Sequence, residues 1–152
     1  MNYIGSKYSL IDFITETISM VTGYRAGENF VFADLFAGTG IVGATYRELG
    51  CHVIANDLQY YSYILNRHLI ENCPPIDTSL LDELNHLEGM EGFIYNNFCS
   101  GSGSNRNYFS DENGKKCDAI RTTLENKFHS AQISEAEYIY GLASLIDSVD
   151  RY

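Results

Sequence analysis

Apolar residues recur at helical spacing close to the start of the chain. Between residues 9 and 22 they fall at Leu10, Ile11, Ile14, Ile18 and Val21. Positions three and four residues apart lie on one face of a helix, and Gly23 follows where such a helix would end. The pattern therefore predicts an amphipathic helix over residues 9–22.

Two short apolar runs come next, and each precedes a helical pattern. Residues 30–36 and 52–58 are predicted to be buried strands. Helices are predicted over about 40–49, stopped by a glycine, and over 59–72, ended by two prolines. The order strand, helix, strand, helix after a leading helix is typical of the beginning of a doubly wound α/β sheet.

The remaining residues alternate between polar and helical patterns. Thr78 or Ser79 is expected to cap a short helix that runs to about residue 87. Residues 92–98 form a candidate third strand, and residues 95–109, rich in glycine, serine and asparagine, are predicted to be a binding loop. Two further helices are predicted, over 110–128 and 134–152.

Composition narrows the class of protein. With 152 residues, of which 45% are apolar, the chain has the size and composition of one globular domain. The four cysteines form no Cys-x-x-Cys pair and do not cluster with the four histidines, which indicates reduced thiols and argues against a metal site. No apolar run approaches the roughly 20 residues of a membrane span, and no signal-peptide pattern is present. A cytoplasmic protein without a membrane contact is therefore expected.

The distribution of charge is more informative than its sum. The net charge of -10 argues against a nucleic-acid-binding surface over the whole chain. Half of the ten basic residues nevertheless fall in one late segment, at Arg106, Lys115, Lys116, Arg121 and Lys127. A solvated helix face and a surface for an anionic partner remain the two interpretations of that segment.

The strongest chemical signal is the stretch FADLFAGTGIVG, residues 32–43. Its glycines fit the pattern Gly-x-Gly-x-x-Gly directly after a predicted strand, and Asp57 follows 19 residues after Gly38, at the end of the next strand. Such a turn exposes backbone N–H groups at a helix start, and a carboxylate in that place holds ribose hydroxyls. The pattern predicts a ligand that contains a nucleoside.

Two classes of ligand compete for this turn. NAD or FAD would bring a pyrophosphate close to Asp34, whose carboxylate would repel it. S-adenosylmethionine brings an ammonium and a sulfonium instead, which a carboxylate attracts. About 29 residues also precede the first predicted strand, whereas an NAD fold usually starts with that strand. Both observations favour S-adenosylmethionine, and we expect Asp34 and Asp57 to border one cleft at the Gly38 turn.

Three motifs in order give the chain a family resemblance. NYIGSK near the start, then DLFAGTG, then ANDLQ resemble the motifs of the adenine-specific DNA methyltransferases of the Dam-like (D12) class, over residues 1 to about 70. YFSDENGKKCDAIR, residues 108–121, further resembles a segment of some members from restriction systems. The resemblance implies a Rossmann-like S-adenosylmethionine-dependent methyltransferase fold and transfer of a methyl group to adenine N6 in double-stranded DNA.

The resemblance also implies roles for individual residues. Tyr3 and Lys7 would line the cofactor site, with Lys7 near the methionine carboxylate. Asp34 would face the amino end of the cofactor, and Asp57 would bind the ribose hydroxyls. Leu58 would pack on the adenine ring. The residues that would wrap the methionine moiety are Phe36, Ala37, Gly38 and Gly40.

The catalytic motif of that family, Asp-Pro-Pro-Tyr or a close variant, has no counterpart here. The only two prolines lie in NCPPID, where Cys73 cannot supply the hydrogen-bond acceptor and Ile76 cannot stack on a flipped base. No catalytic residue is therefore predicted, and the chain alone is expected to be inactive.

The α/β fold is accordingly interpreted as incomplete, with residues 1–94 binding S-adenosylmethionine and residues 95–152 beginning a helical DNA-recognition region. Weak DNA binding is expected from Arg106, Lys115, Lys116 and Arg121. A missing C-terminal half or a second subunit is the further partner that this interpretation requires. Two alternatives remain open: a fragment of an NAD-binding oxidoreductase, and a non-catalytic interaction protein with a degenerate cofactor fold.

Overall fold

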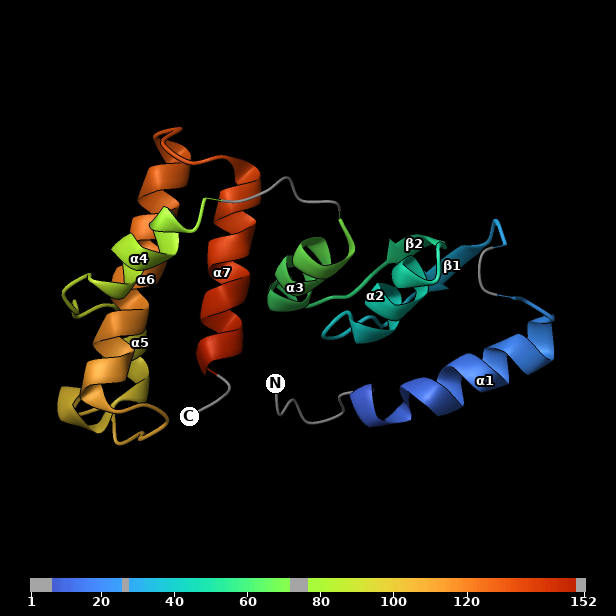
Figure 1. The fold of residues 1–152 in the computed structure, drawn as a ribbon. Helices are drawn as coiled ribbons and strands as arrows, with labels where there is room; N and C mark the ends of the chain where they lie inside the picture. Colours follow the sequence, from blue (N-terminus) through green and yellow to red (C-terminus); the bar gives the residue numbers. More distant parts are fainter. Residues whose placement is uncertain (1–6, 26–27, 72–76, 150–152) are drawn as a thin grey trace. The chain divides into compact units, whose positions relative to one another are not determined.

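The computed structural model describes residues 7–25, 28–71 and 77–149. Contacts between residues divide the chain into two compact units, residues 1–73 with 149–152 and residues 74–148. Each unit has its own set of elements (Figure 1). The predicted functional boundary between residues 94 and 95 falls inside the second unit, within its helix Phe93–Phe98, and this functional division stays a prediction.

In its described residues, the first unit has two parallel strands and three α-helices. Its elements are η1 (Tyr8–Leu10), α1 (Ile11–Thr22), β1 (Val31–Asp34), α2 (Ile41–Glu48), β2 (His52–Ala55) and α3 (Tyr60–Ile70). The predicted order of strands and helices is therefore confirmed, with shorter strands than the apolar runs suggested. Strands β1 and β2 pair in parallel, with Val31 opposite His52 and Asp34 opposite Ala55. This parallel pair joined by a helix is a β-α-β unit.

The core of the first unit lies between the helices and one face of the sheet. Tyr24, Val42, Tyr46 and Cys51 form one cluster of its buried residues. The predicted apolar face of α1 supplies Ile11, Ile14 and Ile18 to this cluster. On the sheet, Phe32 stacks against Tyr46 with ring centroids 3.9 Å apart. The amphipathic pattern of the leading helix thus has the packing role that its spacing indicates.

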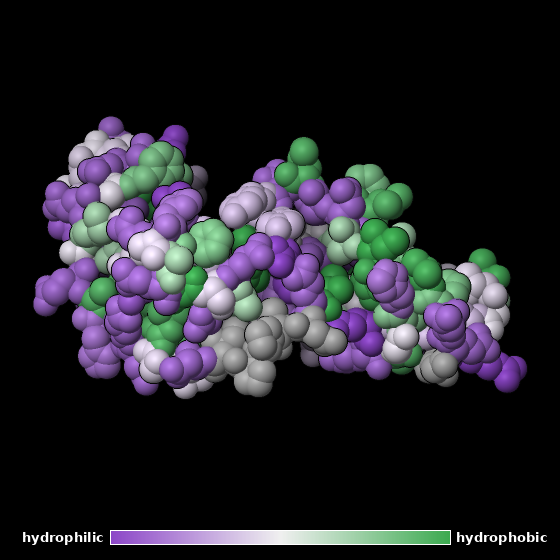
Figure 2. Space-filling model, turned by 90° about the horizontal axis from the view of Figure 1, so that it is seen from above, coloured by the Kyte–Doolittle hydropathy of each residue, from purple (hydrophilic) through white to green (hydrophobic). Residues whose placement is uncertain are grey.

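The other face of the same two strands is exposed in this unit. Val31 on β1 and Ile54 on β2 expose 57% and 51% of their surface. Figure 2 shows green hydrophobic surface, mixed with hydrophilic side chains, in the part of the molecule where Figure 1 places the two strands. Alternate residues of a strand point to opposite faces, so one face is covered by helices and the other is not.

The described elements of the second unit are all helices, joined by loops. Its elements are α4 (Ser79–Asn85), α5 (Phe93–Phe98), η2 (Ser100–Ser102), α6 (Asp111–His129) and α7 (Glu135–Val149). Figure 1 shows α6 and α7 as its two long helices. They pack where Gly141 meets the fully buried Leu124, because a Cβ on Gly141 would lie 2.6 Å from the leucine side chain. Stacking of Phe128 on Tyr138, at 4.5 Å between ring centroids, extends this contact.

The candidate third strand, residues 92–98, is wrong: the segment is helix α5. Its aromatic and β-branched residues favour a strand locally, but the buried carboxylate of Asp118 accepts backbone N–H groups from Gly92, Ile94 and Tyr95, at 3.1, 2.9 and 2.8 Å. These are free N–H groups at a helix start, which an acceptor stabilises. A contact 23 to 26 residues away in sequence therefore overrides the local preference.

Helix starts in this unit are capped partly as expected. Ser110 accepts a hydrogen bond from the N–H of Asn113 and begins α6 as a side-chain cap. Thr78 occupies the cap position of α4, but its side chain makes no capping bond. The carboxylate of Asp77 accepts the N–H of Ser79 instead, at 2.9 Å. Along the described segments, no helix is both long and apolar enough to cross a membrane.

Candidate functional site

The turn between β1 and α2 requires glycine at two positions. Gly38 and Gly40 have φ angles of 54° and 82°, in the left-handed region that side chains disfavour. Gly40 is also the N-cap of α2, and a Cβ there would lie 3.0 Å from Oδ1 of Asn66. The third glycine, Gly43, allows α2 and α3 to approach, because its Cβ would lie 2.6 Å from Ile70. The sequence pattern thus forms the strand, turn and helix that its spacing predicts.

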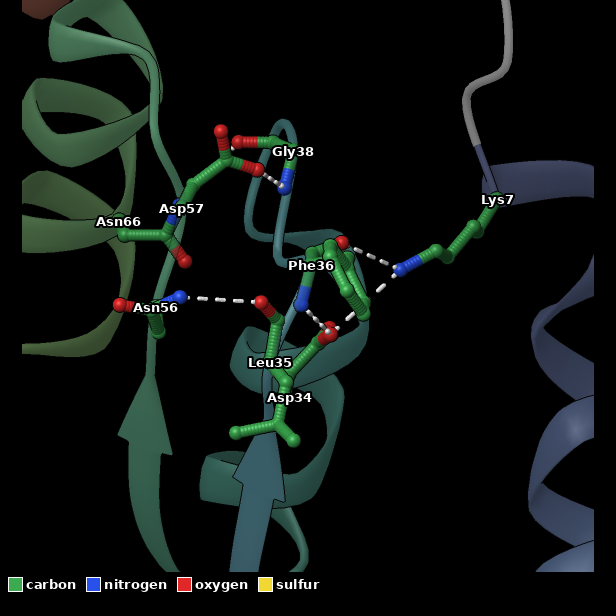
Figure 3. A network of polar contacts seen from close by, with 8 residues as sticks. All are labelled: Lys7, Asp34, Leu35, Phe36, Gly38, Asn56, Asp57 and Asn66. Carbon is green, nitrogen blue, oxygen red and sulfur yellow. Dashed lines mark hydrogen bonds and ion pairs between the residues drawn. The ribbon is translucent and has the colours of Figure 1, made fainter.

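Two side chains that follow β2 hold this turn. The Asp57 carboxylate accepts the N–H of Gly38 at 2.8 Å through Oδ2 and the N–H of Gln59 at 3.0 Å through Oδ1. Figure 3 shows the Asp57 side chain directed at Gly38. The bonds from Gln59 and Gly38 lower the pKa of Asp57, so this carboxylate is charged at neutral pH.

The second of these side chains is Asn66 on α3. Its Nδ2 donates to the carbonyl of Gly38 at 3.2 Å and to that of Ser62 at 2.8 Å. Both backbone polar groups of Gly38 are therefore bound by side chains 19 and 28 residues later. The sequence motifs did not point to Asn66; the available signal was an asparagine inside a predicted helix, among the buried residues Ser62, Ile64 and Leu65.

Asp34 reaches the same turn from the end of β1. Its Oδ1 accepts the N–H of Phe36 at 3.2 Å, and Nζ of Lys7 lies 3.5 Å from that oxygen. Lys7 also donates to the carbonyl of Phe36 at 2.9 Å (Figure 3). Asp34 is only 9% exposed, and its Oδ2 is buried without a hydrogen-bond partner among the described residues. A buried carboxylate oxygen without a donor is costly, and a cationic ligand would satisfy it.

Asp34 and Asp57 thus contact one turn, at Phe36 and Gly38. A pocket of about 270 Å³ beside β2 is lined by Asp57, Asn66 and Arg67 among others, and Asp34 is not part of its lining. The expectation that both carboxylates border a single cleft stays a prediction.

The other predicted cofactor residues differ in exposure. Ala37 is 3% exposed, and its N–H donates to the carbonyl of Asn56 at 3.0 Å, so it belongs to the framework of the turn. Phe36 and Leu58 are 81% and 95% exposed beside it. Tyr3 lies outside the described residues. Large apolar side chains exposed next to a polar turn are available to a ligand, and their individual roles stay predictions.

Two of the four predicted DNA-binding cations are engaged within the second unit. Nζ of Lys115 lies 2.7 Å from the carboxylate of Glu91 and 4.4 Å from the ring centre of Tyr95. The bond with Glu91 raises the pKa of Lys115. Lys116 donates to the carbonyl groups of Asn85, at 2.8 Å, and Leu87 at the end of α4. Both lysines are therefore bound to other residues of the second unit. Binding to a DNA phosphate would require them to leave these partners.

The two arginines of that set are more accessible. The guanidinium carbon of Arg106 lies 5.5 Å from the ring centre of Phe98, on an exposed side chain in the polar loop. Arg121 is exposed on α6. Among the predicted cations, these two are placed where an external anion can reach them.

Candidate metal or thiol chemistry finds no support in the described segments. There, no group of three or more histidine, cysteine or acidic side chains could hold a metal ion. Cys51, Cys99 and Cys117 are free and buried. Burial raises the pKa of the Cys99 and Cys117 thiols, which keeps them protonated and unreactive.

Comparisons with known proteins match nearly the whole chain. The family model described as D12 class N6 adenine-specific DNA methyltransferase matches residues 3–152. Type II methyltransferase M.NlaIII from Neisseria lactamica is 48% identical over 99% of this chain and 46% of its own length. For type II methyltransferase M.FokI from Planomicrobium okeanokoites, the identity is 38% over 98% of this chain and 24% of the relative.

A viral relative is matched over a similar share of its own length. Type II methyltransferase M.CviAII from Paramecium bursaria Chlorella virus 1 is 34% identical over 99% of this chain and 45% of its own length. The chain thus spans less than half the length of the curated relatives described here. No solved structure gives a significant match.

Proposed function

Because the chain belongs to the family of D12 class N6 adenine-specific DNA methyltransferases, we propose that it binds S-adenosylmethionine for a restriction-modification enzyme. In this proposal it forms the cofactor-binding portion of an enzyme that methylates adenine N6 in double-stranded DNA. The family leaves the position of the cofactor on this chain open. The proposal therefore depends on whether the residues of the glycine turn suit that molecule.

The observation that carries the proposal is the unpartnered carboxylate oxygen of Asp34. It is buried beside the turn, and among the described residues the cation near this carboxylate is Nζ of Lys7, which lies 3.5 Å from the other oxygen. The ammonium of S-adenosylmethionine would supply the missing donor. A pyrophosphate would instead meet this carboxylate as a like charge, which disfavours NAD.

Asp57 suits the ribose because its orientation is already fixed. Its two oxygens accept the N–H groups of Gly38 and Gln59, and a carboxylate has further acceptor positions that can bind a hydroxyl. Leu58, exposed directly after it, and Phe36 on the turn offer apolar surface to the adenine and methionine parts. Binding would then bury side chains that now face water.

When bound, the cofactor supplies an electrophilic methyl group. The described residues would bind and orient it: Asp34 fixes its cationic end, Asp57 its ribose, and the clamped turn keeps both at a constant separation. The sequence contains no Asp-Pro-Pro-Tyr motif to accept hydrogen bonds from the adenine amino group. We therefore propose that the chain alone does not transfer methyl groups and requires a polypeptide that carries the motif.

Calorimetric titration with S-adenosylmethionine and, separately, with NAD tests the cofactor. We expect binding of the first and none of the second, and weaker binding by Asp34→Asn. The matched control is Asp12→Asn, which removes an exposed carboxylate from α1. Equal binding of both ligands, or equal affinities of the two variants, would contradict the proposal.

Activity is tested with labelled S-adenosylmethionine and DNA from a host without adenine methylation. The chain alone should leave the DNA unlabelled. Adding the C-terminal part of a full-length relative, which supplies the missing motif, should restore labelling if the two parts associate. Labelling by the chain alone would show that the transfer chemistry resides in these residues after all.

A further inference from the structure

Three aromatic rings and one arginine form an exposed cluster in the second unit. The ring centroids of Phe93 and Phe98 are 6.0 Å apart, and those of Phe98 and Tyr108 are 5.9 Å apart. The guanidinium of Arg106 lies over the ring of Phe98. Phe93 and Tyr108 expose 63% and 74% of their surface. We call Phe93, Phe98, Arg106 and Tyr108 the aromatic cluster.

The backbone holds these rings in place. Asp118 binds the N–H groups in the first turn of helix α5. This helix carries both Phe93 and Phe98. The N–H of Tyr108 donates to the carbonyl of Phe98 at 3.0 Å, which joins the end of the polar loop to the end of α5. The rings are therefore exposed by a rigid framework, and a contiguous exposed apolar surface of this kind is typical of a binding site.

The charge around the cluster suits an anionic partner. From Gly92 to Ser110 the sequence contains no acidic residue, although the chain has 20 in total, and Arg106 is the single charged side chain of that stretch. Asp111 follows, but its carboxylate accepts the N–H of Gly101 at 2.9 Å. Glu112 is exposed nearby on α6. The cluster itself thus carries one positive charge and no negative charge, on a chain with a net charge of -10.

We propose that the aromatic cluster is the surface through which this chain contacts DNA bases. The exposed rings of Phe93 and Tyr108 insert between base steps of the duplex and stack on the bases there, and Arg106 donates to a phosphate next to them. This assignment rests on the proposed function, because it is the DNA-modifying family that makes a duplex the partner. It shifts the contact from Lys115 and Lys116, which are bound within the fold, to helix α5 and the loop that follows it.

The absence of tryptophan from the chain provides a direct probe. Tyr108→Trp introduces a single indole in the cluster, and Phe13→Trp introduces one at a comparably exposed position, 68%, on α1 of the first unit. A short duplex added at low salt should quench the emission of Tyr108→Trp, because a stacked base quenches indole, and should leave Phe13→Trp unchanged. No quenching, or equal quenching of both proteins, overturns the proposal.

Salt dependence separates base contacts from phosphate contacts. Fluorescence anisotropy with the labelled duplex should show weaker binding by Phe93→Ala with an unchanged slope of log affinity against log salt. Arg106→Ala should reduce the slope by about 0.9, the value for one phosphate contact. The controls Phe13→Ala and Arg25→Ala, both exposed in the first unit, should bind as the parent does. Equal losses in test and control variants would overturn the assignment.

Titration of the same proteins with S-adenosylmethionine keeps the two proposals distinguishable. If the cofactor binds but the cluster variants bind DNA as the parent does, this inference is wrong and the proposed function stands. If the parent binds neither cofactor nor DNA, the proposed function itself is wrong.

Discussion

Replacing Asp118 by alanine should loosen helix α5 and the loop that follows it. The Asp118 side chain is 3% exposed, and its carboxylate accepts three backbone N–H groups at 2.8–3.1 Å. Asp118→Ala would leave these three donors without their acceptor. Gly92, the first of the three, already lies against the carboxylate, because a Cβ there would be 2.6 Å from Cγ of Asp118.

The magnitude follows from opposing contributions. Hydrogen bonds to a charged group contribute roughly 1.5–3 kcal/mol each, so three bonds set an upper limit well above 4 kcal/mol. Removing the carboxylate also removes the cost of its burial, and water can reach the half-buried start of α5. The loss of a single capping side chain costs about 0.5–2 kcal/mol and sets the lower limit. We expect a destabilisation of about 2–4 kcal/mol, a large fraction of the roughly 4–11 kcal/mol expected for a unit of this size.

Hydrogen exchange read by mass spectrometry measures this effect where it occurs. Amides of residues 92–98 should lose protection in Asp118→Ala, while those of α7 should change only as far as the whole unit is destabilised. Asp118→Asn should have an intermediate effect, because its single amide oxygen can still accept. The control is Arg121→Ala, at an exposed position of the same helix. If Asp118→Ala changes the protection of α5 no more than this control does, the carboxylate does not hold the helix.

Three further predictions concern other parts of the chain. Asp57→Ala should weaken S-adenosylmethionine binding by at least about tenfold in calorimetry, because it removes both the ribose acceptor and the bond to Gly38. An unchanged affinity would show that neither the ribose acceptor nor the bond to Gly38 contributes to binding. Lys116→Met should lower the thermal unfolding temperature of the second unit, because Nζ of Lys116 is bound to carbonyl groups at the end of α4. The slope of log DNA affinity against log salt should stay unchanged; a smaller slope would show that Lys116 contacts a phosphate. The hydrogen bond with Cys51, together with burial, raises the pKa of Tyr24 from 10.0 to about 12. The resulting stabilisation is complete below pH 10 and is lost as the pH rises toward 12, so the unfolding temperature should fall over that range. Tyr24→Phe should reduce this alkaline fall, and an unaltered fall in the variant would show that Tyr24 does not cause it.

The sequence was sufficient to predict the parts of the structure that depend on residues close together in the chain. The leading helix, the two strands and the glycine turn all follow from periodicity and from the conformational needs of glycine, as the positive φ angles of Gly38 and Gly40 confirm. The family resemblance also came from short motifs, and the match over residues 3–152 confirms it. The positions of Asp34 and Asp57 at one turn follow from the parallel order of two successive strands.

Distant contacts explain what the sequence did not reveal. Residues 92–98 carry the composition of a strand, and the carboxylate of Asp118, more than 20 residues later, binds the N–H groups at the start of the helix that they form. Lys115 and Lys116 look like free cations in the sequence, because their partners on and after α4 come 24 to 31 residues earlier. Likewise, no local pattern indicates that Asn66 binds the carbonyl of Gly38.

The clamp on Gly38 has a consequence for protein engineering. The glycine-rich segment looks like a portable cassette, a contiguous peptide that could be transplanted between methyltransferases to alter cofactor preference. Its conformation, however, is specified in part by Asp57 and Asn66, which belong to a different stretch of the chain. A graft of residues 34–43 alone would bring the glycines without the two groups that orient them. The smallest transferable module therefore extends from β1 through α3, and chimeras that join two parents between α2 and α3 should be built with that dependence in mind.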